Sequence, residues 1–109
     1  MKTREEVIRQ CLSYPNTYED YPFNDSWAII RHKHNKKMFA AIFPREDGVW
    51  VNLKAEPMWG DFWKNAYAAV VPAYHMNKEH WISVILNGTV DEEDICRMIF
   101  DSYTLTKGK

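Results

Sequence analysis

The chain has 109 residues, of which 46 % are hydrophobic and 15 % aromatic, and its 14 Lys and Arg residues against 15 Asp and Glu give a formal net charge of −1. This length suits one domain with a single core, and the apolar content excludes a disordered chain. Because phosphate neutralisation supplies most of the affinity of nucleic-acid-binding proteins, a near-neutral chain must use a local group of cations for such binding.

The two cysteines, Cys11 and Cys96, are far apart and form no Cys-x-x-Cys pair, which argues against a disulfide framework or a zinc knuckle. The first residues contain no apolar signal core, and no stretch reaches the roughly 18 apolar residues of a membrane-spanning helix. We therefore expect a cytoplasmic monomer that has no metal or cofactor and does not contact a membrane.

A helix is predicted over residues 4–13. Thr3 and Glu6 fit a capping box, in which the Thr hydroxyl accepts a hydrogen bond from the backbone of Glu6 and the Glu carboxylate reaches back to the backbone of Thr3. Residues 15–26 contain two Pro, two Asn and two Asp, a composition typical of loops. The aromatic residues that we expect to anchor this loop to the core are Tyr18, Tyr21 and Phe23.

Three strands are predicted next, at 27–32, 37–43 and 49–54, where apolar and β-branched residues recur. The links between them, 32–36 and 44–48, are short and polar, and the second contains Asp-Gly, a strong turn signal. Both links suit antiparallel hairpins.

Pro57 can occupy the first turn of a helix, and apolar residues at helical spacing extend that helix over 58–69, with Pro72 ending it. Residues 73–79 are predicted to form a connector. A fourth strand is predicted over 80–86, and both of its faces are apolar, which favours a position inside the sheet.

A last helix is predicted over 92–104, because the acidic residues at 91–94 favour the positive end of a helix dipole. We expect the tail at 106–109 to fray. The order helix, three strands, helix, strand, helix predicts an α+β fold in which an antiparallel β-sheet is covered on one face by helices. The first and last helices each have one apolar stripe, so we expect them to share that face.

Positive charge is concentrated at the tip of the first predicted hairpin, where residues 31–37 carry four fixed cations and no acid. These cations are Arg31, Lys33, Lys36 and Lys37. A basic β-wing of this kind can lie along a phosphate backbone or enter a groove of DNA. The alternative is a solvated turn whose lysines keep the protein soluble and protect a strand edge.

The segment 72–81 is a second candidate, because it is rich in aromatic and hydrogen-bonding residues. Asn77 and Lys78 could contact phosphates. The side chains available for stacking or hydrogen bonding are Tyr74, His75 and Trp81. A metal site would use His75 and His80, but their separation of five residues suits neither a helix nor a strand. Alternatively, these polar side chains tie the connector to nearby backbone groups.

Enzyme motifs do not occur in the sequence: it has no GxSxG, no phosphate-binding loop, no HExxH and no GxGxxG. Both cysteines lie among apolar residues, where a reactive thiolate is disfavoured. We therefore do not expect an enzyme.

The segment 72–88, PAYHMNKEHWISVILNG, resembles the hallmark of the MmcQ/YjbR family. Weaker features of the family occur in the same order along the chain, namely YPF at 21–23, KKMFA at 36–40, VNLKAEP at 51–57 and DSY at 101–103. The resemblance implies one domain over residues 1–109 with the CyaY-like (frataxin-like) two-layer sandwich, also described as a double-wing DNA-binding fold. The residues of the family motif are Tyr74, His75, Met76, Asn77, Lys78, His80 and Trp81.

Two functions follow from these features. The first is weak, salt-dependent DNA binding through a basic hairpin wing. Its candidate contacts are Arg31, Lys33, Lys36, Lys37, Lys54, Asn77 and Lys78. The second is a non-catalytic adaptor that binds a protein or a small ligand through an exposed apolar patch. The aromatic residues that would form this patch are Trp50, Trp59, Trp63 and Tyr74.

Overall fold

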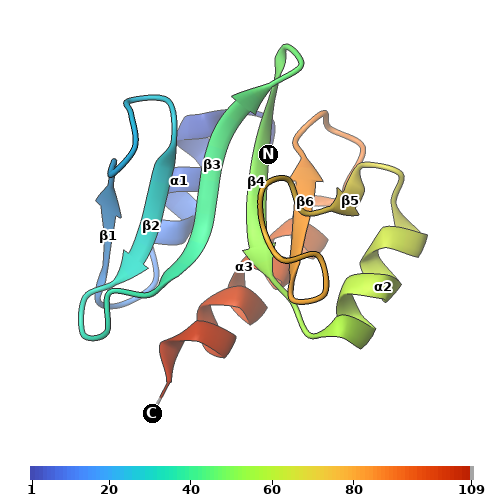
Figure 1. The fold of residues 1–109 in the computed structure, drawn as a ribbon. Coiled ribbons are helices and arrows are strands. Elements are labelled where there is room, and N and C mark those ends of the chain that lie inside the picture. The colour runs from blue at the N-terminus through green and yellow to red at the C-terminus, as the bar shows by residue number, and fades with distance from the viewer. Residues whose placement is uncertain (109) are drawn as a thin grey trace.

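The computed structural model describes residues 1–108, which form three helices and one six-stranded antiparallel sheet (Figure 1). The helices are α1 (Arg4–Leu12), α2 (Pro57–Ala66) and α3 (Glu92–Lys107). The strands are β1 (Thr17–Asp20), β2 (Ala28–His32), β3 (Met38–Arg45), β4 (Gly48–Lys54), β5 (Val70–Pro72) and β6 (Trp81–Ile85). The predicted α+β class is therefore confirmed.

The strands are ordered β1-β2-β3-β4-β6-β5 across the sheet, and every neighbouring pair is antiparallel. The chain leaves β4 through α2, reaches β5 at the edge and returns inward as β6. The position of β6 between β4 and β5 confirms the interior strand that its two apolar faces predicted. The edges are short, with four residues in β1 and three in β5.

Helices α1 and α3 pack together on one face of the sheet, as the apolar stripes predicted (Figure 1). From α1, Val7 and Cys11 are buried against the strands, and from α3, Ile95 and Ile99 are buried in the same cluster. Their burial removes large apolar surfaces from water, which is the main stabilising contribution to such a fold. No helix within residues 1–108 combines the length and apolar character needed to cross a membrane.

The first helix begins as the sequence indicated. The hydroxyl of Thr3 accepts a hydrogen bond from the backbone N–H of Glu6 at 3.2 Å, and the backbone N–H of Thr3 donates to the Glu6 carboxylate at 3.1 Å. This reciprocal capping box satisfies backbone N–H groups that the first turn would otherwise leave free.

Two short edge strands were not predicted. Residues 17–20, expected to be loop, pair with β2 as β1. Tyr21 and Phe23 do not anchor this region to the core, since they are 40 % and 71 % exposed. The second helix ends at Ala66 rather than at 69, because the chain beyond it pairs with β6 as β5. Pro72 therefore lies in an edge strand, where a missing N–H is tolerated.

The second hairpin turn and the last helix also differ from their predicted limits. Strand β3 continues to Arg45, and the turn consists of Glu46 and Asp47, with φ of 51° and 61°. Two consecutive positive φ values match the twist of a two-residue hairpin. Helix α3 continues to Lys107, and Thr106, expected in a frayed tail, is buried. Lys109, in the same predicted tail, lies outside the described residues.

Candidate functional site

The β2–β3 turn is held against the end of α3 and does not protrude. The His34 ring nitrogen Nε2 lies 2.7 Å from the Lys107 carbonyl oxygen, and the Asn35 side-chain amide donates to the carbonyls of Thr106 and Lys107 at 3.0 and 3.1 Å. The last carbonyls of a helix have no partner within the helix, so these two side chains act as a cap supplied by a distant turn. The expectation of a free wing is corrected accordingly.

Arg31 has a structural role in this turn. Its Nε lies 2.8 Å from the Asp20 carboxylate, and its Nη1 donates to the Lys36 carbonyl at 3.0 Å. The side chain therefore links β2 to the edge strand β1 and to the turn. Because its charge is already paired, Arg31 is removed from the predicted set of phosphate contacts.

Lys33, Lys36 and Lys37, here called the turn lysines, are exposed. Among residues 1–108 none of them takes part in an ion pair. Lys107 is also exposed and lies at the helix end to which the turn is bonded. Four ammonium groups thus belong to one small region in which the backbone is fixed by hydrogen bonds.

The connection between β5 and β6 (residues 73–80) lies over the face of the sheet that α1 and α3 leave open (Figure 1). Two buried polar residues fix it there: the Asn52 amide donates to the Tyr74 carbonyl at 2.8 Å, and the Tyr74 N–H donates to the Ser83 hydroxyl at 2.9 Å. Ser83 in turn donates to the Asn52 side-chain oxygen. The backbone at Tyr74 is thereby held from both sides.

Asn77 also holds this connection in place, through its side-chain oxygen. Its Oδ1 accepts hydrogen bonds from the backbone N–H groups of Glu79 and His80 at 2.8 and 3.1 Å. This is the tying role that the sequence offered as the alternative. Lys78 is exposed on the same connection, whereas Lys54 is half-buried at the end of β4. No group of three His, Cys, Asp or Glu side chains able to hold a metal occurs within residues 1–108.

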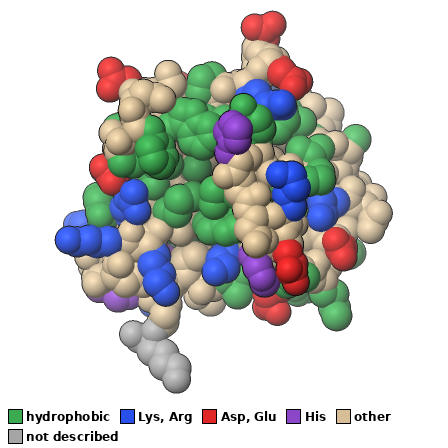
Figure 2. All heavy atoms as spheres, in the orientation of Figure 1, with side chains coloured by type: hydrophobic (Ala, Val, Ile, Leu, Met, Phe, Trp, Pro, Cys, Tyr) green, Lys and Arg blue, Asp and Glu red, His purple; other side chains and the backbone are tan. Residues whose placement is uncertain are grey.

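Aromatic rings cover part of the open face. Trp27 stacks on Phe43 with ring centroids 4.0 Å apart, Phe43 stacks with Tyr74 at 5.7 Å, and the Arg45 guanidinium lies 4.3 Å from the Tyr74 ring centroid. A groove of about 510 Å³ lies beside this stack. Figure 2 shows this face, with an apolar area in its upper middle and Lys and Arg side chains toward the end of β2 and the start of β3 at left and lower left.

The predicted aromatic patch does not form as a single surface. Trp50 and Trp63 are buried, Tyr74 is half-buried, and Trp59 is the member that remains 44 % exposed. Trp50 and Tyr74 belong to the open face of the sheet, whereas Trp59 and Trp63 lie on α2. The expectation of one exposed patch is therefore wrong.

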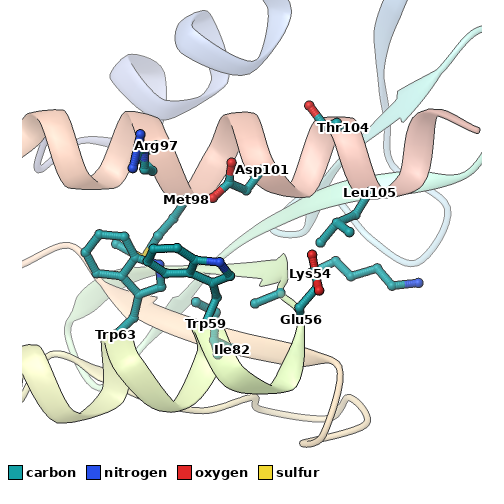
Figure 3. Close-up of a pocket in the computed structure, with 11 residues that line it drawn as sticks. Lys54, Glu56, Trp59, Trp63, Ile82, Arg97, Met98, Asp101, Thr104 and Leu105 are labelled. Carbon is teal, nitrogen blue, oxygen red and sulfur yellow. The ribbon is translucent and has the colours of Figure 1, made fainter.

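Trp59 and Trp63 instead line a pocket of about 300 Å³ between α2, α3 and the end of β4 (Figure 3). The other residues around it are Lys54, Ala55, Glu56, Ile82, Arg97, Met98, Asp101, Thr104 and Leu105. In Figure 3 the Asp101 carboxylate points from α3 toward the indole of Trp59, while Lys54 extends away from both indoles. A volume of this size can hold a small organic molecule.

The environments of the two cysteine thiols disfavour the reactive thiolate form. Burial raises the pKa of the Cys11 thiol to about 12, and burial also raises the pKa of Cys96, with the nearby Glu92 carboxylate acting in the same direction. Both groups are therefore thiols at neutral pH, and a thiol is a poor nucleophile compared with a thiolate.

Comparison with known proteins places this geometry in a family. A family model described as YjbR matches residues 12–105, which extend from the end of α1 almost to the end of α3. The chain belongs to the YjbR family. The resemblance stated from the sequence motifs is thereby confirmed.

Relatives of this YjbR-family chain cover nearly all of its length. The uncharacterised protein YyaQ of Bacillus subtilis (strain 168) is 35 % identical over 119 residues, which span 98 % of this chain and 100 % of YyaQ. The uncharacterised protein YjbR of Escherichia coli (strain K12) is 29 % identical over 101 residues, which span 93 % of this chain and 84 % of that protein.

Solved structures of similar chains share the fold. The Deinococcus radiodurans protein DR2400, with a DUF419 domain, superposes with a TM-score of 0.90 at 29 % identity and covers 100 % of this chain and 81 % of its own. A Pseudomonas syringae protein superposes with a TM-score of 0.84 at 31 % identity, covering 95 % of this chain and 98 % of its own. The YjbR-family fold therefore extends over the whole described chain.

Two features of the site in this YjbR-family chain were missed from the sequence. His34 and Asn35 were assigned only to a basic turn, and their partners at the end of α3 lie 71 to 73 residues away. The aromatic residues of α2 were singled out, but Asp101 was not, because no local sequence signal shows that α2 and α3 line the same pocket. The DSY motif was the one available signal that this part of α3 is special.

Proposed function

We propose that this YjbR-family protein binds DNA weakly, through contacts between phosphates and the turn lysines. The observation that supports this most is that three exposed ammonium groups lie in one turn, with no ion pair among residues 1–108 and with Lys107 beside them. Local positive charge of this kind attracts a polyanion even when the net charge is −1.

The position of the β2–β3 turn against α3 favours contacts to DNA phosphates. Because His34 and Asn35 fix the turn against α3, the lysines are presented on an ordered backbone, and less conformational entropy is lost on binding than for a free wing. A turn that lies against the body cannot reach deep into a groove. We therefore propose phosphate contacts, which position a protein on DNA without reading its sequence.

Lys54 and Lys78 are secondary contacts in this proposal. Lys78 is exposed on the 73–80 connection, and Lys54 is half-buried at the end of β4, beside the pocket between α2 and α3. Arg31 is left out because its charge is paired with Asp20, and Asn77 because it is uncharged and its side chain holds the 73–80 connection. The proposal thus rests on fewer cations than the sequence suggested.

The experiment is a titration of a fluorescently labelled DNA duplex, followed by anisotropy at several salt concentrations. Wild-type protein should bind at low salt, and the logarithm of its affinity should fall linearly with the logarithm of salt concentration. Replacing the turn lysines together, Lys33→Ala, Lys36→Ala and Lys37→Ala, should reduce the steepness of that line by roughly 2.7, because each phosphate contact contributes about 0.9.

A matched control removes the same charge elsewhere. The variant Lys2→Ala, Arg9→Ala, Lys64→Ala also loses three cations, of which Lys64 already lies 3.5 Å from the Asp61 carboxylate. This variant should keep the wild-type slope of affinity against salt, with only a small loss of affinity at every salt concentration. If the two triple variants bind alike, or if the wild-type protein does not bind the duplex at all, the proposal is wrong.

A second function, ligand binding, is supported by a separate observation. Trp59 is half-exposed and, with Trp63, lines the pocket between α2 and α3. None of the turn lysines lines this pocket, so ligand binding there can be measured separately from DNA binding.

A further inference from the structure

The pocket between α2 and α3 is lined in part by the segments that carried the family resemblance. Lys54, Ala55 and Glu56 come from VNLKAEP, Asp101 comes from DSY, and Ile82 comes from the hallmark segment. These segments are far apart in the chain, and the fold brings them to one cavity of about 300 Å³ (Figure 3).

Two of the three residues in DSY have evident structural roles. The Ser102 hydroxyl donates to the Phe39 carbonyl at 2.6 Å and accepts from the Lys54 N–H at 2.9 Å, and the Tyr103 hydroxyl donates to the Pro15 carbonyl at 3.0 Å. Asp101 differs from both, because its carboxylate makes no hydrogen bond and no ion pair within residues 1–108. Its position is therefore not explained by the stability of the fold.

The surroundings of Asp101 disfavour an unpaired negative charge. Partial burial raises the pKa of this carboxyl, the nearby Arg97 opposes that shift, and the Glu56 carboxylate adds to it. Arg97 lies one helical turn away on α3 and does not approach to 4 Å, and Lys54 extends away from the indoles (Figure 3). The charged form of a partly buried, unpaired carboxylate is stabilised when a cation enters the cavity beside it.

The wall opposite Asp101 is aromatic. The Trp59 and Trp63 rings are stacked with centroids 6.1 Å apart and planes 29° from parallel, and Trp59 is 44 % exposed. The floor is apolar, from Ile82, Met98 and Ala55. Indole faces are the best aromatic partners of organic cations, which have an apolar body and a diffuse charge. Aromatic wall, apolar floor and unpaired carboxylate together match one chemical class of ligand.

We propose that this pocket binds a small alkylammonium ion, whose charge lies between the Asp101 carboxylate and the Trp59 indole. Glu56, at the same rim, adds a second negative charge. Two cations of the protein, Arg97 and Lys54, also line the pocket; Arg97 is the one whose charge acts on Asp101, so it competes with the ligand and weakens binding. None of the turn lysines belongs to the site, and Lys54 is the one residue that it shares with the proposed DNA contacts.

The test compares two probes of nearly equal shape at neutral pH. Choline carries a trimethylammonium group, and 3,3-dimethylbutan-1-ol is its neutral counterpart. Calorimetry should detect saturable binding of choline, weak as expected for a small ligand, and no comparable binding of the alcohol. In two-dimensional NMR spectra of the five Trp indole N–H groups, Trp59 and Trp63 should shift on addition of choline, while Trp27, Trp50 and Trp81 should not.

Two substitutions should change the affinity for choline in opposite directions. Asp101→Asn keeps the shape of the side chain, removes no hydrogen bond, and should weaken binding by at least about tenfold. Arg97→Gln removes the competing cation and should strengthen it. Asp61→Asn, an exposed acid of α2 that lies beside Lys64 and outside the pocket, should leave the affinity unchanged.

Several results would overturn the proposal. Equal binding of the alcohol would mean an apolar cavity without charge recognition. Unchanged affinity in a folded Asp101→Asn variant would remove the carboxylate from the site. If choline binding to the wild-type protein does not saturate, or if only the other three indoles shift, then the pocket does not bind the cation. None of these results bears on DNA binding, which is measured separately.

Discussion

Ser102 is a fully buried serine whose hydroxyl joins α3 to two strands of the sheet. The β3–β4 ladder has its last paired residues at Ala40 and Leu53. One residue further, the Phe39 carbonyl and the Lys54 N–H both bond to the Ser102 hydroxyl instead of to each other. A single side chain thus satisfies two backbone groups where the strands separate.

The variant Ser102→Ala should leave both of those groups buried without a partner. We expect it to lower the free energy of unfolding by about 1–3 kcal/mol. Urea unfolding followed by circular dichroism measures this loss. Thr104→Ala, an exposed position on the same helix, should change stability by no more than about 0.5 kcal/mol. Equal stability of the two variants would mean that water or a strand shift replaces the serine hydroxyl.

His32 makes stability depend on pH. It is buried, its Nε2 lies 2.8 Å from the Thr106 hydroxyl, and burial lowers the pKa of its imidazole, with the charges of His34 and Lys107 acting in the same direction. The unfolded chain therefore takes up a proton at higher pH than the folded one does. The stabilising contribution of neutral His32 is fully present above the ordinary pKa of 6.5 and is lost as pH falls below it.

Melting temperatures measured on either side of the ordinary histidine pKa test this expectation. On acidification, the melting temperature of the wild-type protein should fall further than that of a His32→Gln variant. His80→Gln, which changes an exposed histidine, should behave like the wild type. A wild-type protein and a His32→Gln variant with parallel pH profiles would contradict the assignment.

At the level of elements, α2 approaches the sheet closely at Gly60. A Cβ atom at this position would lie 3.4 Å from the Ile82 Cγ2 and 3.8 Å from the Ala55 Cβ, which is ordinary van der Waals contact. Gly60→Ala should therefore fit and stabilise the protein by about 0.5–1 kcal/mol, because glycine loses more backbone entropy in a helix. Gly60→Val, with two further methyl groups, should destabilise it in the same denaturation experiment.

Elements with a strong local pattern were predictable, and those defined by pairing were not. The capping box of α1, the apolar face of α3 and the hairpins of β2, β3 and β4 follow from residues near one another in the chain. Strand β5 consists of Val70–Pro72, preceded by residues that fit a helix equally well, and its pairing with β6 decides its structure. Strand β1 likewise depends on its register with β2.

The extension of α3 to Lys107 also has a long-range cause. Thr106 is buried beside His32, and the carbonyls that end the helix are bonded by His34 and Asn35. The sequence indicated the basic turn and the acidic start of α3 separately. It could not indicate that the turn caps the other end of that helix, since the partners are more than 70 residues apart.

At the scale of the whole molecule, the two ends of α3 carry opposite charge. Its first turn carries Glu92, Glu93 and Asp94, and its last turn lies against the turn that bears Lys33 and Lys36. Although the net charge is −1, α3 therefore has acidic residues at one end and basic residues at and beside the other. In the DNA binding proposed above, this arrangement would turn the basic end of α3 toward the polyanion before contact.

The two candidate sites lie at different places around the same helix. Asp101 faces the cavity next to α2, while the carbonyl of Lys107 receives the β2–β3 turn. Sequence patterns identified the lysines of one site and the tryptophans of the other, because both are clusters of a residue type. They did not identify Asp101, because it stands out only in the structure, where Ser102 and Tyr103 form hydrogen bonds and the Asp101 carboxylate forms none within residues 1–108.

The strands become shorter from the middle of the sheet outward. β3 and β4 have eight and seven residues, whereas the two outermost strands have four and three, and one of these contains Pro72. Within residues 1–108 the sheet thus ends on both sides in a brief row of free backbone groups. A second chain that tried to extend the sheet could form few hydrogen bonds, so the shape of the sheet protects the protein against amyloid-like stacking.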